Sequence, residues 1–281
     1  MIGTANGNQA HAIITGGSSG IGLATACLLA RNGVSVTILA RNLERLENAR
    51  NRIASLAAGR VRVAAMSCDV GVGDACRAAV EQSIAEMGPP TWAVACAGVV
   101  KPGTFMTLSL DDHLSQLQTN FIGSLNFAHA VVPAMARHGG GHLVFVASGA
   151  ALVGVYGYSA YCPSKFAVRG LAEVLRVELC THRIVVTLVH PPDTNTPQLA
   201  FEFPLRPRPT QEIAAGAGLW EPDQVAAALV RCAQRRKFLV VLGWQLRLLN
   251  TFHSLAAPGF RIYQNWIVKR PIGRIPPQSQ L

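Results

Sequence analysis

The sequence is short of charged residues: Asp, Glu, Lys and Arg make up 14% of its 281 residues, whereas hydrophobic residues make up 50%. A chain of this composition can bury enough apolar surface to fold, which excludes intrinsic disorder. Acidic residues are the scarcer sign, 15 against 25 Lys and Arg, so the formal net charge is +10. The mean hydropathy of +0.28 indicates either a heavily buried parallel sheet or some affinity for a membrane.

The basic excess does not form a nucleic-acid-binding pattern. Arginine and lysine are scattered along the chain, and no basic run is interleaved with aromatic residues, as a nucleic-acid site would require. We therefore expect no nucleic-acid partner. The positive charge instead favours an anionic cofactor or an anionic membrane surface.

Patterns for metal binding, disulfides, secretion and membrane spanning are also missing. The seven cysteines form no CxxC and no Cys/His ligand set, so we expect no metal site and a reducing compartment. The first ten residues, MIGTANGNQA, lack the charged start and apolar core of a signal peptide. No run of about 18 apolar residues occurs in 243–270, which argues against a spanning helix there. A cytoplasmic protein is the expectation.

What the chain does contain is a regular alternation of strand and helix patterns. Short apolar runs predict strands at 11–15, 34–40, 61–66, 91–96, 142–148, 183–189 and 238–242. Most are apolar throughout, as strands covered on both faces are. Helical patterns occupy 20–32, 42–57, 73–87, 111–137, 158–181 and 221–235. This alternation predicts an α/β fold, a single Rossmann-like doubly wound parallel sheet of about seven strands with helices on both faces.

Two segments fall outside the alternation. Residues 193–220 are rich in Pro, Thr and Gly and predict a lid insertion over one end of the sheet. Residues 243–270 are apolar but interrupted by polar residues and Pro258. They are either a helix packed on the core or a second subunit, or an amphipathic segment at a membrane interface. We therefore divide the chain into a catalytic domain, 1–242, which includes the lid, and an extension, 243–281.

A glycine-rich loop, TGGSSGIG at 15–22, follows the first predicted strand and opens a helix. Glycines let the backbone turn tightly there and approach a pyrophosphate at the helix N-terminus. The strand–loop–helix context predicts dinucleotide binding. The predicted contacts are Gly16, Ser18, Ser19, Gly20, Ile21 and Gly22.

The end of the second predicted strand bears on the choice of dinucleotide. An NAD-preferring fold usually places an acidic residue there for the ribose 2′-hydroxyl, but this chain has Ala40 followed by Arg41. Arg41 can face a 2′-phosphate, so NADPH/NADP is the predicted cofactor. The alternative is that Arg41 is only a solvated residue at a helix start. Asp69 and Val70 close the third strand and are expected to contact the adenine.

Three residues form a candidate catalytic set. Ser148 ends the fifth predicted strand, and Tyr161 and Lys165 lie four residues apart, on one face of a helix. Together with the glycine loop, Cys96-Ala97-Gly98 and Asn120, this set resembles the short-chain dehydrogenase/reductase family over roughly residues 11–240.

The resemblance implies a role for each residue. Tyr161 would be the general acid that protonates the alkoxide left by hydride transfer, with an unperturbed pKa near ~10. The Lys165 ammonium, together with the positive charge of the oxidised nicotinamide, would lower that pKa, and Lys165 would also hold the nicotinamide ribose. Ser148 would hydrogen-bond the carbonyl oxygen, and Asn120 would support a water relay to Lys165. The further implied cofactor contacts are Ala97, Gly98, Tyr161, Lys165, Pro191, Thr194 and Thr196.

The chain departs from the family pattern at two places. Ala95 stands where an asparagine is usual, which puts a structural hydrogen bond in doubt, and Pro192 replaces the glycine that usually follows Pro191. For Asp193 two roles are open: a cap on the lid's first turn, which we favour, or a position near a substrate ammonium.

The run PPDTNTP at 191–197 and the segment around Tyr161 are similar to one branch of the family, whose members reduce the ketone of 3-ketodihydrosphingosine with NADPH. The resemblance implies a long-chain ketone lipid as substrate, peripheral contact with the cytosolic face of a membrane through the C-terminal segment, and a homodimer or homotetramer formed through 111–137 and 158–181. The alternatives are a reductase of an acyl thioester, steroid or retinoid-like carbonyl, and a non-catalytic NADP-binding regulatory protein.

Overall fold

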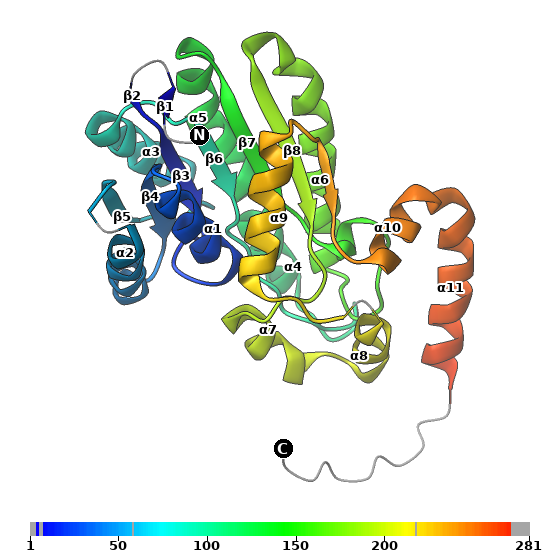
Figure 1. Cartoon of the computed structure of the whole chain (residues 1–281). Coiled ribbons are helices and arrows are strands. Elements are labelled where there is room, and N and C mark those ends of the chain that lie inside the picture. Colours follow the sequence, from blue (N-terminus) through cyan, green and yellow to red (C-terminus); the bar gives the residue numbers. More distant parts are fainter. Residues whose placement is uncertain (1–3, 6–7, 58, 217, 271–281) are drawn as a thin grey trace.

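The computed structural model describes residues 4–5, 8–57, 59–216 and 218–270. Their main feature is a seven-stranded parallel sheet with strand order β5-β4-β3-β6-β7-β8-β9 (Figure 1), which confirms the predicted fold class. A two-stranded antiparallel ribbon of β1 (Thr4–Ala5) and β2 (Asn8–Gln9), which was not predicted, precedes it. The sheet strands are β3 (His11–Thr15), β4 (Ser35–Ala40), β5 (Val63–Ser67), β6 (Trp92–Ala95), β7 (Gly141–Val146), β8 (Ile184–His190) and β9 (Leu239–Val241).

The strand order creates the crevice in which a dinucleotide binds in folds of this type. From the central β3 the chain first adds β4 and β5 on one side and then returns to add β6 on the other. Side chains of β3 are buried on both faces of the sheet, because helices cover both. The carboxyl ends of β3 and β6 therefore diverge at a topological switch point, where ligands bind in open α/β sheets.

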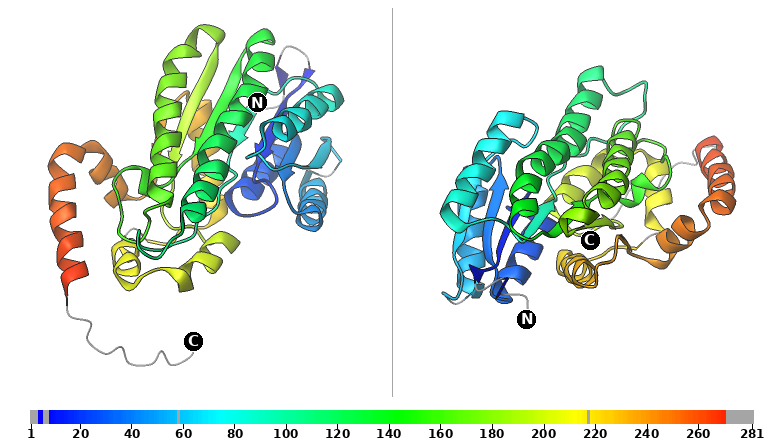
Figure 2. Two further views of the ribbon diagram at one scale, coloured as in Figure 1. Left: turned by 180° about the vertical axis from the view of Figure 1, so that it is seen from behind. Right: turned by 90° about the horizontal axis from the view of Figure 1, so that it is seen from above.

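Helices cover the sheet in two layers (Figure 2). One layer contains α1 (Gly20–Arg31), α2 (Leu43–Ala57) and α9 (Pro222–Gln234), and α1 packs on both of the others. The other contains α3 (Gly73–Met87), α5 (Gly123–Arg137) and α6 (Tyr161–Glu178). Each layer buries its own apolar cluster against the sheet.

The helix predicted at 111–137 is divided in the structure. It comprises α4 (Leu110–Leu117), a π-helical turn (Gln118–Ile122) and α5. Ser109 caps α4 by accepting a hydrogen bond from the Asp112 backbone N–H. π-Helical turns are rare, and they occur often at functional sites; this one contains Asn120.

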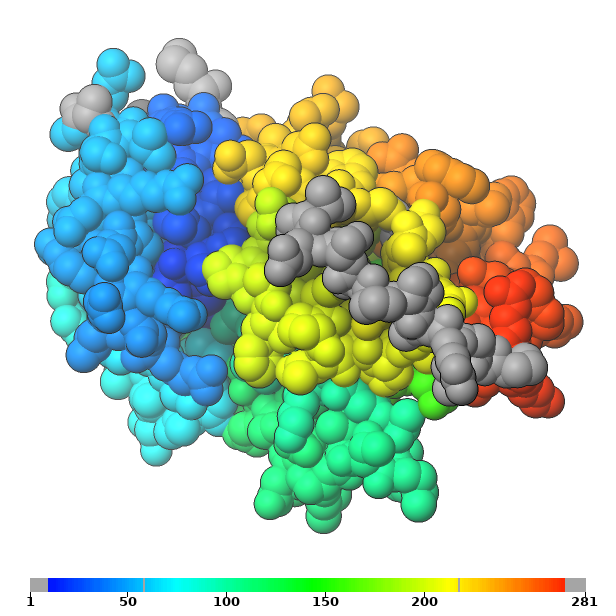
Figure 3. Space-filling model, turned by 90° about the horizontal axis from the view of Figure 1, so that it is seen from below, coloured from blue at the N-terminus to red at the C-terminus, as the bar shows by residue number. Residues whose placement is uncertain are grey.

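The lid insertion, 193–220, folds into α7 (Pro197–Glu202), a short 3-10 turn (Phe203–Leu205) and α8 (Arg208–Ala215) beyond the carboxyl ends of the strands (Figure 1). Its neck is closed by backbone hydrogen bonds. The Trp220 N–H donates to the Asp193 carbonyl at 2.9 Å, and the Asn195 N–H donates to the Trp220 carbonyl at 2.8 Å. Figure 3 shows the lid, in yellow, between the blue N-terminal part and the orange and red C-terminal helices.

The C-terminal segment forms α10 (Trp244–Thr251) and α11 (His253–Lys269). Leu246 of α10 packs so closely on Gly149 that a Cβ there would lie 2.9 Å from a Leu246 methyl carbon. The side chain of Gln264 on α11 accepts a hydrogen bond from the Tyr156 N–H and donates one to the Gly154 carbonyl. The extension thus docks on the loop after β7, and its residues 271–281 lie outside the described part. Across the described ranges, no helix combines the length and apolar character needed to cross a bilayer.

Candidate active site

A cavity of about 1010 Å³ lies between the carboxyl edge of the sheet, the lid and the C-terminal helices. Of the residues predicted to form the site, Asn120 alone does not line it. Those that do are Gly16, Ser18, Ser19, Gly20, Ile21, Gly22, Arg41, Asp69, Val70, Ala97, Gly98, Ser148, Tyr161, Lys165, Pro191, Thr194 and Thr196. The fold therefore brings together residues that the sequence spreads over 180 positions.

The glycine loop is a backbone cradle at the N-terminus of α1. Gly16 has a φ of +68°, and a Cβ added there would lie 2.8 Å from the Ala97 nitrogen. A Cβ on Gly22 would lie 2.3 Å from the Gly16 carbonyl oxygen. Only glycine leaves this space open, next to helix N–H groups that attract an anion. The cradle fits the pyrophosphate of a dinucleotide.

The loop after β6 keeps its shape without the asparagine that Ala95 replaces. The hydroxyl oxygen of Thr15, at the end of β3, accepts hydrogen bonds from the N–H groups of Cys96 at 3.1 Å and Ala97 at 3.2 Å. The same hydroxyl donates to the Val94 carbonyl. Thr15 therefore holds the two neighbouring strand ends together, and the structural hydrogen bond in doubt from the sequence has a substitute.

The adenosine end of the cavity carries two arginines. Arg41 lies 3.9 Å from the Asp69 carboxylate, and both side chains are partly exposed. Arg45, in the first turn of α2, lines the same region, and its N–H donates to the Asn42 side chain that begins the helix. The sequence prediction missed Arg45, although its spacing of four residues from Arg41 places both near one helix start. Two cations at this point fit a 2′-phosphate.

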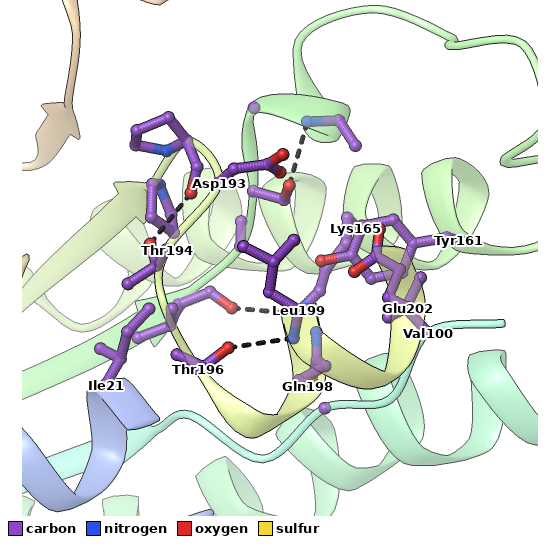
Figure 4. Close-up of a pocket in the computed structure, with 18 of the residues that line it drawn as sticks. Ile21, Val100, Tyr161, Lys165, Asp193, Thr194, Thr196, Gln198, Leu199 and Glu202 are labelled. Carbon is purple, nitrogen blue, oxygen red and sulfur yellow. Dashed lines mark hydrogen bonds between the residues drawn. The ribbon is translucent and has the colours of Figure 1, made fainter. Parts of the chain in front are cut away.

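Tyr161, Lys165 and Ser148 meet at the centre of the cavity (Figure 4 shows Tyr161 and Lys165). Tyr161 is the first residue of α6, which leaves Pro163 in the first turn, where a missing N–H is tolerated. Lys165 follows one turn later, and its Nζ donates to the Val146 carbonyl at 3.1 Å and lies 5.7 Å from the Tyr161 ring centroid. Ser148 follows the end of β7 by two residues.

Burial dominates the titration of this set. It lowers the pKa of Lys165 to about 8. It also raises the pKa of Tyr161 above the ordinary range, helped by the negative charge of Glu202 and opposed by a hydrogen bond with Ser148. The sequence led us to expect that Lys165 would lower the Tyr161 pKa. Without the cofactor, desolvation disfavours the phenolate more than its protein neighbours stabilise it, and the lowering by Lys165 together with an oxidised nicotinamide stays a prediction.

Asn120 lies outside the cavity and hydrogen-bonds residues that line it or lie next to those that do. Its side chain accepts from the Val99 N–H at 2.8 Å and donates to the Val99 carbonyl at 3.0 Å and the Ser164 hydroxyl at 2.8 Å. A Cβ on Gly98 would lie 3.2 Å from Asn120 Oδ1 and 3.3 Å from Lys165 Nζ, so Gly98 separates the two. In the described chain no hydrogen bond joins Asn120 directly to Lys165, and a relay between them remains a prediction.

The strand exit His190-Pro191 fixes the position of Ser148. His190 Nδ1 lies 2.7 Å from the Ser148 carbonyl, and the Gly149 N–H donates to the Pro191 carbonyl at 3.0 Å. Burial lowers the His190 pKa to about 4, so the ring is neutral at pH 7. A carbonyl can only accept, so Nδ1 carries the proton. The stiff exit therefore holds the loop that carries Ser148.

Asp193 does not cap the lid's first turn, so the favoured prediction for it is wrong. Thr196 is the N-cap of α7, and its hydroxyl accepts from the Leu199 N–H at 3.2 Å (Figure 4). The Asp193 carboxylate instead accepts two hydrogen bonds from the guanidinium of Arg206, 13 residues later. A short turn followed by proline left no sequence signal for that contact.

Arg206 also binds Glu202, which in turn accepts a hydrogen bond from the hydroxyl of Tyr158. These three side chains line the cavity and are almost fully buried. The sequence did not predict Glu202 or Arg206 as site residues, because a single acid and a single base in a proline-rich insertion form no recognisable motif.

The arrangement suits proton donation to a carbonyl beside a bound dinucleotide. A reduced nicotinamide dinucleotide, when bound in the cradle, supplies a hydride. Tyr161 holds a proton that its raised pKa keeps in place at neutral pH, and Ser148 is placed to share the same oxygen. Lys165 lines the same cavity, and its contact with the ribose stays a prediction. The described ranges contain no group of residues that could hold a metal ion.

Comparisons with known proteins agree with this chemistry. The family model described as short chain dehydrogenase matches residues 10–204. The chain is 35% identical over 238 residues to a 3-dehydrosphinganine reductase of Danio rerio, covering 84% of this chain and 72% of that protein. It is 40% identical over 252 residues to a 3-dehydrosphinganine reductase of Arabidopsis thaliana, covering 89% and 74%.

Solved structures share the fold. An alcohol dehydrogenase from Thermococcus sibiricus, solved with 5-hydroxy-NADP, has a TM-score of 0.72 and 24% identity, over 83% of this chain and 96% of that one. At this level of identity the likeness concerns the fold alone.

Proposed function

The chain belongs to the short-chain dehydrogenase family, and we propose that it reduces the ketone of 3-ketodihydrosphingosine to dihydrosphingosine with NADPH. One observation carries the proposal. Ser148, Tyr161 and Lys165 open into a cavity of about 1010 Å³ whose far walls are apolar. That space accommodates a long acyl chain beside the proton donor, and relatives spanning 84% and 89% of this chain are named for the same reduction.

The apolar walls come from segments outside the sheet. Leu199 and Phe201 belong to the lid, Leu246 and Leu249 to α10, and Phe260 to α11. Burying an alkyl chain against such side chains contributes about 0.8 kcal/mol per methylene group. A substrate with a long chain would therefore bind far better than a small ketone with the same reacting group.

NADPH, rather than NADH, is supported by Arg41 and Arg45 at the adenosine end. At the end of β4, Ala40 stands where a carboxylate would repel a 2′-phosphate, and guanidinium groups bind phosphate through paired hydrogen bonds. In the reduction, Tyr161 gives its proton to the ketone oxygen while Ser148 donates a hydrogen bond to that oxygen. Lys165 hydrogen-bonds the nicotinamide ribose.

The substrate proposal is tested with purified protein, NADPH and defined ketones. We expect loss of NADPH absorbance with 3-ketodihydrosphingosine and little with an acetoacetyl thioester. Rapid NADPH oxidation with the thioester alone would instead support the acyl-thioester alternative. No oxidation with any ketone, alongside tight NADPH binding, would favour the non-catalytic one.

We also propose that α10 and α11 rest on an anionic membrane surface. The segment 243–270 contains four basic residues and no acidic one. Its exposed apolar side chains recur at helical spacing, and they are Trp244, Leu248, Phe252, Leu255, Ile262 and Trp266. An apolar face with basic neighbours is typical of helices that lie in a membrane interface.

The membrane proposal predicts co-sedimentation with vesicles that contain anionic lipid. Leu255→Glu with Ile262→Glu should abolish it, because each change places a negative charge on the apolar face. Phe105→Glu with Met106→Glu, at an exposed apolar site away from these helices, is the matched control. Equal loss with the control pair, or binding to purely zwitterionic vesicles alone, would refute the proposal.

A homodimer or homotetramer is proposed through α4 and α6. Exposed apolar residues form a stripe on each helix: Leu110, Leu114 and Leu117 on α4, and Phe166, Val174 and Val177 on α6. Light scattering coupled to gel filtration should give a mass of two or four chains. Val174→Glu with Val177→Glu should shift it to one chain.

A further inference from the structure

Glu202 is a buried carboxylate at the end of α7 that faces the cavity (Figure 4). Only 6% of the residue is exposed. Both of its hydrogen bonds use one oxygen, Oε1, which accepts from the Tyr158 hydroxyl and from Arg206 Nε at 2.8 Å. Within the described chain no donor reaches Oε2. Oε2 is not fully enclosed by protein, and Glu202 lines the cavity, so a donor on a ligand can reach this oxygen there.

The charges around Glu202 do not balance. Arg206, with 5% of its surface exposed, donates to the Asp193 carboxylate through Nη2 at 2.8 Å and also binds Glu202. One guanidinium therefore serves two carboxylates, and Tyr158 adds no charge because burial keeps its pKa far above the ordinary range. Burial raises the pKa of Glu202, while the charge of Arg206 and the hydrogen bond from Tyr158 oppose that rise. With both acids ionised, the network carries a net charge of about −1. It would be neutralised by one cation in the cavity.

This negative charge lies close to the reacting group. The ring of Tyr158, which binds Glu202, lies 5.5 Å from the ring of Tyr161 between centroids. After burial, the charge of Glu202 is the largest influence that raises the Tyr161 pKa. A cation held by Glu202 would thus stand next to a carbonyl that accepts its proton from Tyr161.

We propose that Glu202 binds the substrate's ammonium group through Oε2, and that Asp193, Arg206 and Tyr158 position its carboxylate. The inference rests on the proposed function, because 3-ketodihydrosphingosine carries an ammonium on the carbon next to the ketone. In that molecule the carbon that accepts the hydride is bonded directly to the carbon that carries the ammonium, and Tyr161 and Glu202 are correspondingly neighbours in the cavity. Glu202 is then a specificity residue of the lid, which selects amino ketones over uncharged ones.

The geometry also explains how uncharged ketones are rejected. An acyl thioester or a steroid has no cation to pair with Oε2, so this oxygen would be covered by the bound substrate without gaining a donor. Leaving a buried charged group without its partner weakens binding more than an ordinary lost contact does. Discrimination therefore arises from the penalty on the wrong substrate as well as the contact with the right one.

The test compares two ketones that differ in the amine alone: 3-ketodihydrosphingosine and 1-hydroxyoctadecan-3-one, each with NADPH. We expect the wild-type protein to favour the amino ketone in kcat/KM, and Glu202→Gln to reduce that ratio by about 10- to 100-fold, the range for a charge-assisted hydrogen bond. Inhibition by dihydrosphingosine should weaken in the same variant, whereas inhibition by the corresponding long-chain diol should not. The second readout measures binding without the chemical step.

Matched variants separate the contact from general damage to the lid. Glu212→Gln removes a more exposed carboxylate on α8 that is paired with Arg208, and it should leave the ratio within about twofold. Glu202→Asp retains the charge and should give a ratio between those of wild type and Glu202→Gln. It also provides the test if Glu202→Gln fails to fold, which NADPH binding and thermal melting would report. Asp193→Asn should lower the ratio less than Glu202→Gln, because it loosens Arg206 without removing the binding charge.

The outcomes distinguish the inference from the function on which it rests. Failure of the wild-type protein to reduce the amino ketone would overturn the proposed function. Reduction of the amino ketone with no preference over the uncharged ketone, or a ratio that Glu202→Gln leaves within about twofold, would overturn the role of Glu202 alone.

Discussion

The two halves of the cavity are built by different means. The cofactor half, around β3, α1 and β6, is made of backbone: a glycine loop with no room for a Cβ, and Thr15 binding the N–H groups of the next strand's loop. The substrate half is made of side chains from the lid and α10–α11, with an ionic network under exposed apolar residues such as Phe201, 63% exposed. A backbone site tolerates little change, whereas a side-chain site can change its ligand by single substitutions.

The largest effect should come from the residue at the boundary between the halves. Tyr161→Phe removes the proton donor but keeps the ring that packs with Tyr158. Turnover should fall by about 10³-fold, within the range for general acid catalysis. Titration should show NADPH binding within about twofold of wild type, because neither half loses its contacts. A variant that loses NADPH binding as well would mean that the two halves are not independent.

The cofactor half should be intolerant of a single methyl group. In Gly22→Ala the new Cβ would meet the Gly16 carbonyl oxygen at 2.3 Å, so the loop must move. We expect NADPH affinity to fall by about 100-fold and stability to fall by roughly 1–3 kcal/mol. Gly170→Ala, on an exposed face of α6 with nothing within 4 Å, is the control and should be neutral or stabilising by up to about 1 kcal/mol. Equal affinities for the two variants would contradict the backbone cradle.

The cofactor half also uses side chains at the adenosine end, and there a single substitution should change the preferred ligand, as in the substrate half. Arg41→Asp replaces a cation at the adenosine end with an anion, so the ratio of kcat/KM for NADPH over NADH should fall by about 10- to 100-fold. Arg50→Ala, on α2 and paired with Glu47, is the control outside the cavity and should leave the ratio unchanged. NADH supporting an equal rate in the wild-type protein would refute the NADPH assignment.

A pH profile should report Lys165 rather than Tyr161. Burial lowers the Lys165 pKa to about 8 and raises that of Tyr161 above the ordinary range. The lysine is charged below pH 8 and loses its proton above it, while Tyr161 stays protonated. Reductive kcat/KM should therefore be level near pH 7 and fall about tenfold for each unit above 8. A profile that stays level to pH 10 would show that the charge of Lys165 is not required.

Much of the fold and the cofactor half could be predicted from the sequence. Strand runs such as 11–15 and 183–189 are mostly apolar because both faces of the sheet are covered, and their parallel arrangement follows from the alternation with helices. The glycine loop and the Tyr161/Lys165 pair are each detectable because the residues of each motif lie close together in the sequence at fixed spacing. Local geometry dictates those residue types, so local patterns reveal them.

The substrate half could not be predicted in the same way. Asp193, Glu202 and Arg206 meet through a turn and a short helix, and the pairing depends on how the lid folds back. Asp193 was therefore predicted as a cap, although Thr196 performs that role. The rise in the Tyr161 pKa in the cofactor-free protein was also not predicted, because burial is a property of the whole structure. The π-helical turn at Asn120 was missed for the same reason, since it breaks a helical pattern that the sequence presents as continuous.

The smallest effect should mark the boundary of the substrate half. Thr210 of α8 donates a hydrogen bond from its hydroxyl to the Tyr156 carbonyl at 2.7 Å and packs against Gly157, so it fixes the lid on the loop that leads to Tyr161. Thr210→Val keeps the shape and removes the hydrogen bond, at a cost of about 1 kcal/mol to the closed lid. KM for the lipid ketone should rise about three- to fivefold, while NADPH affinity stays unchanged, because the lid contacts the acyl chain and the glycine cradle does not depend on it. Thr181→Val, at an exposed 3-10 turn just after the C-terminal end of α6, should change neither the KM nor the NADPH affinity. If Thr210→Val weakened NADPH binding as much as it raised KM, the lid would support the cofactor as well as the substrate. The division of the cavity into a backbone site for the cofactor and a side-chain site for the substrate would then be wrong.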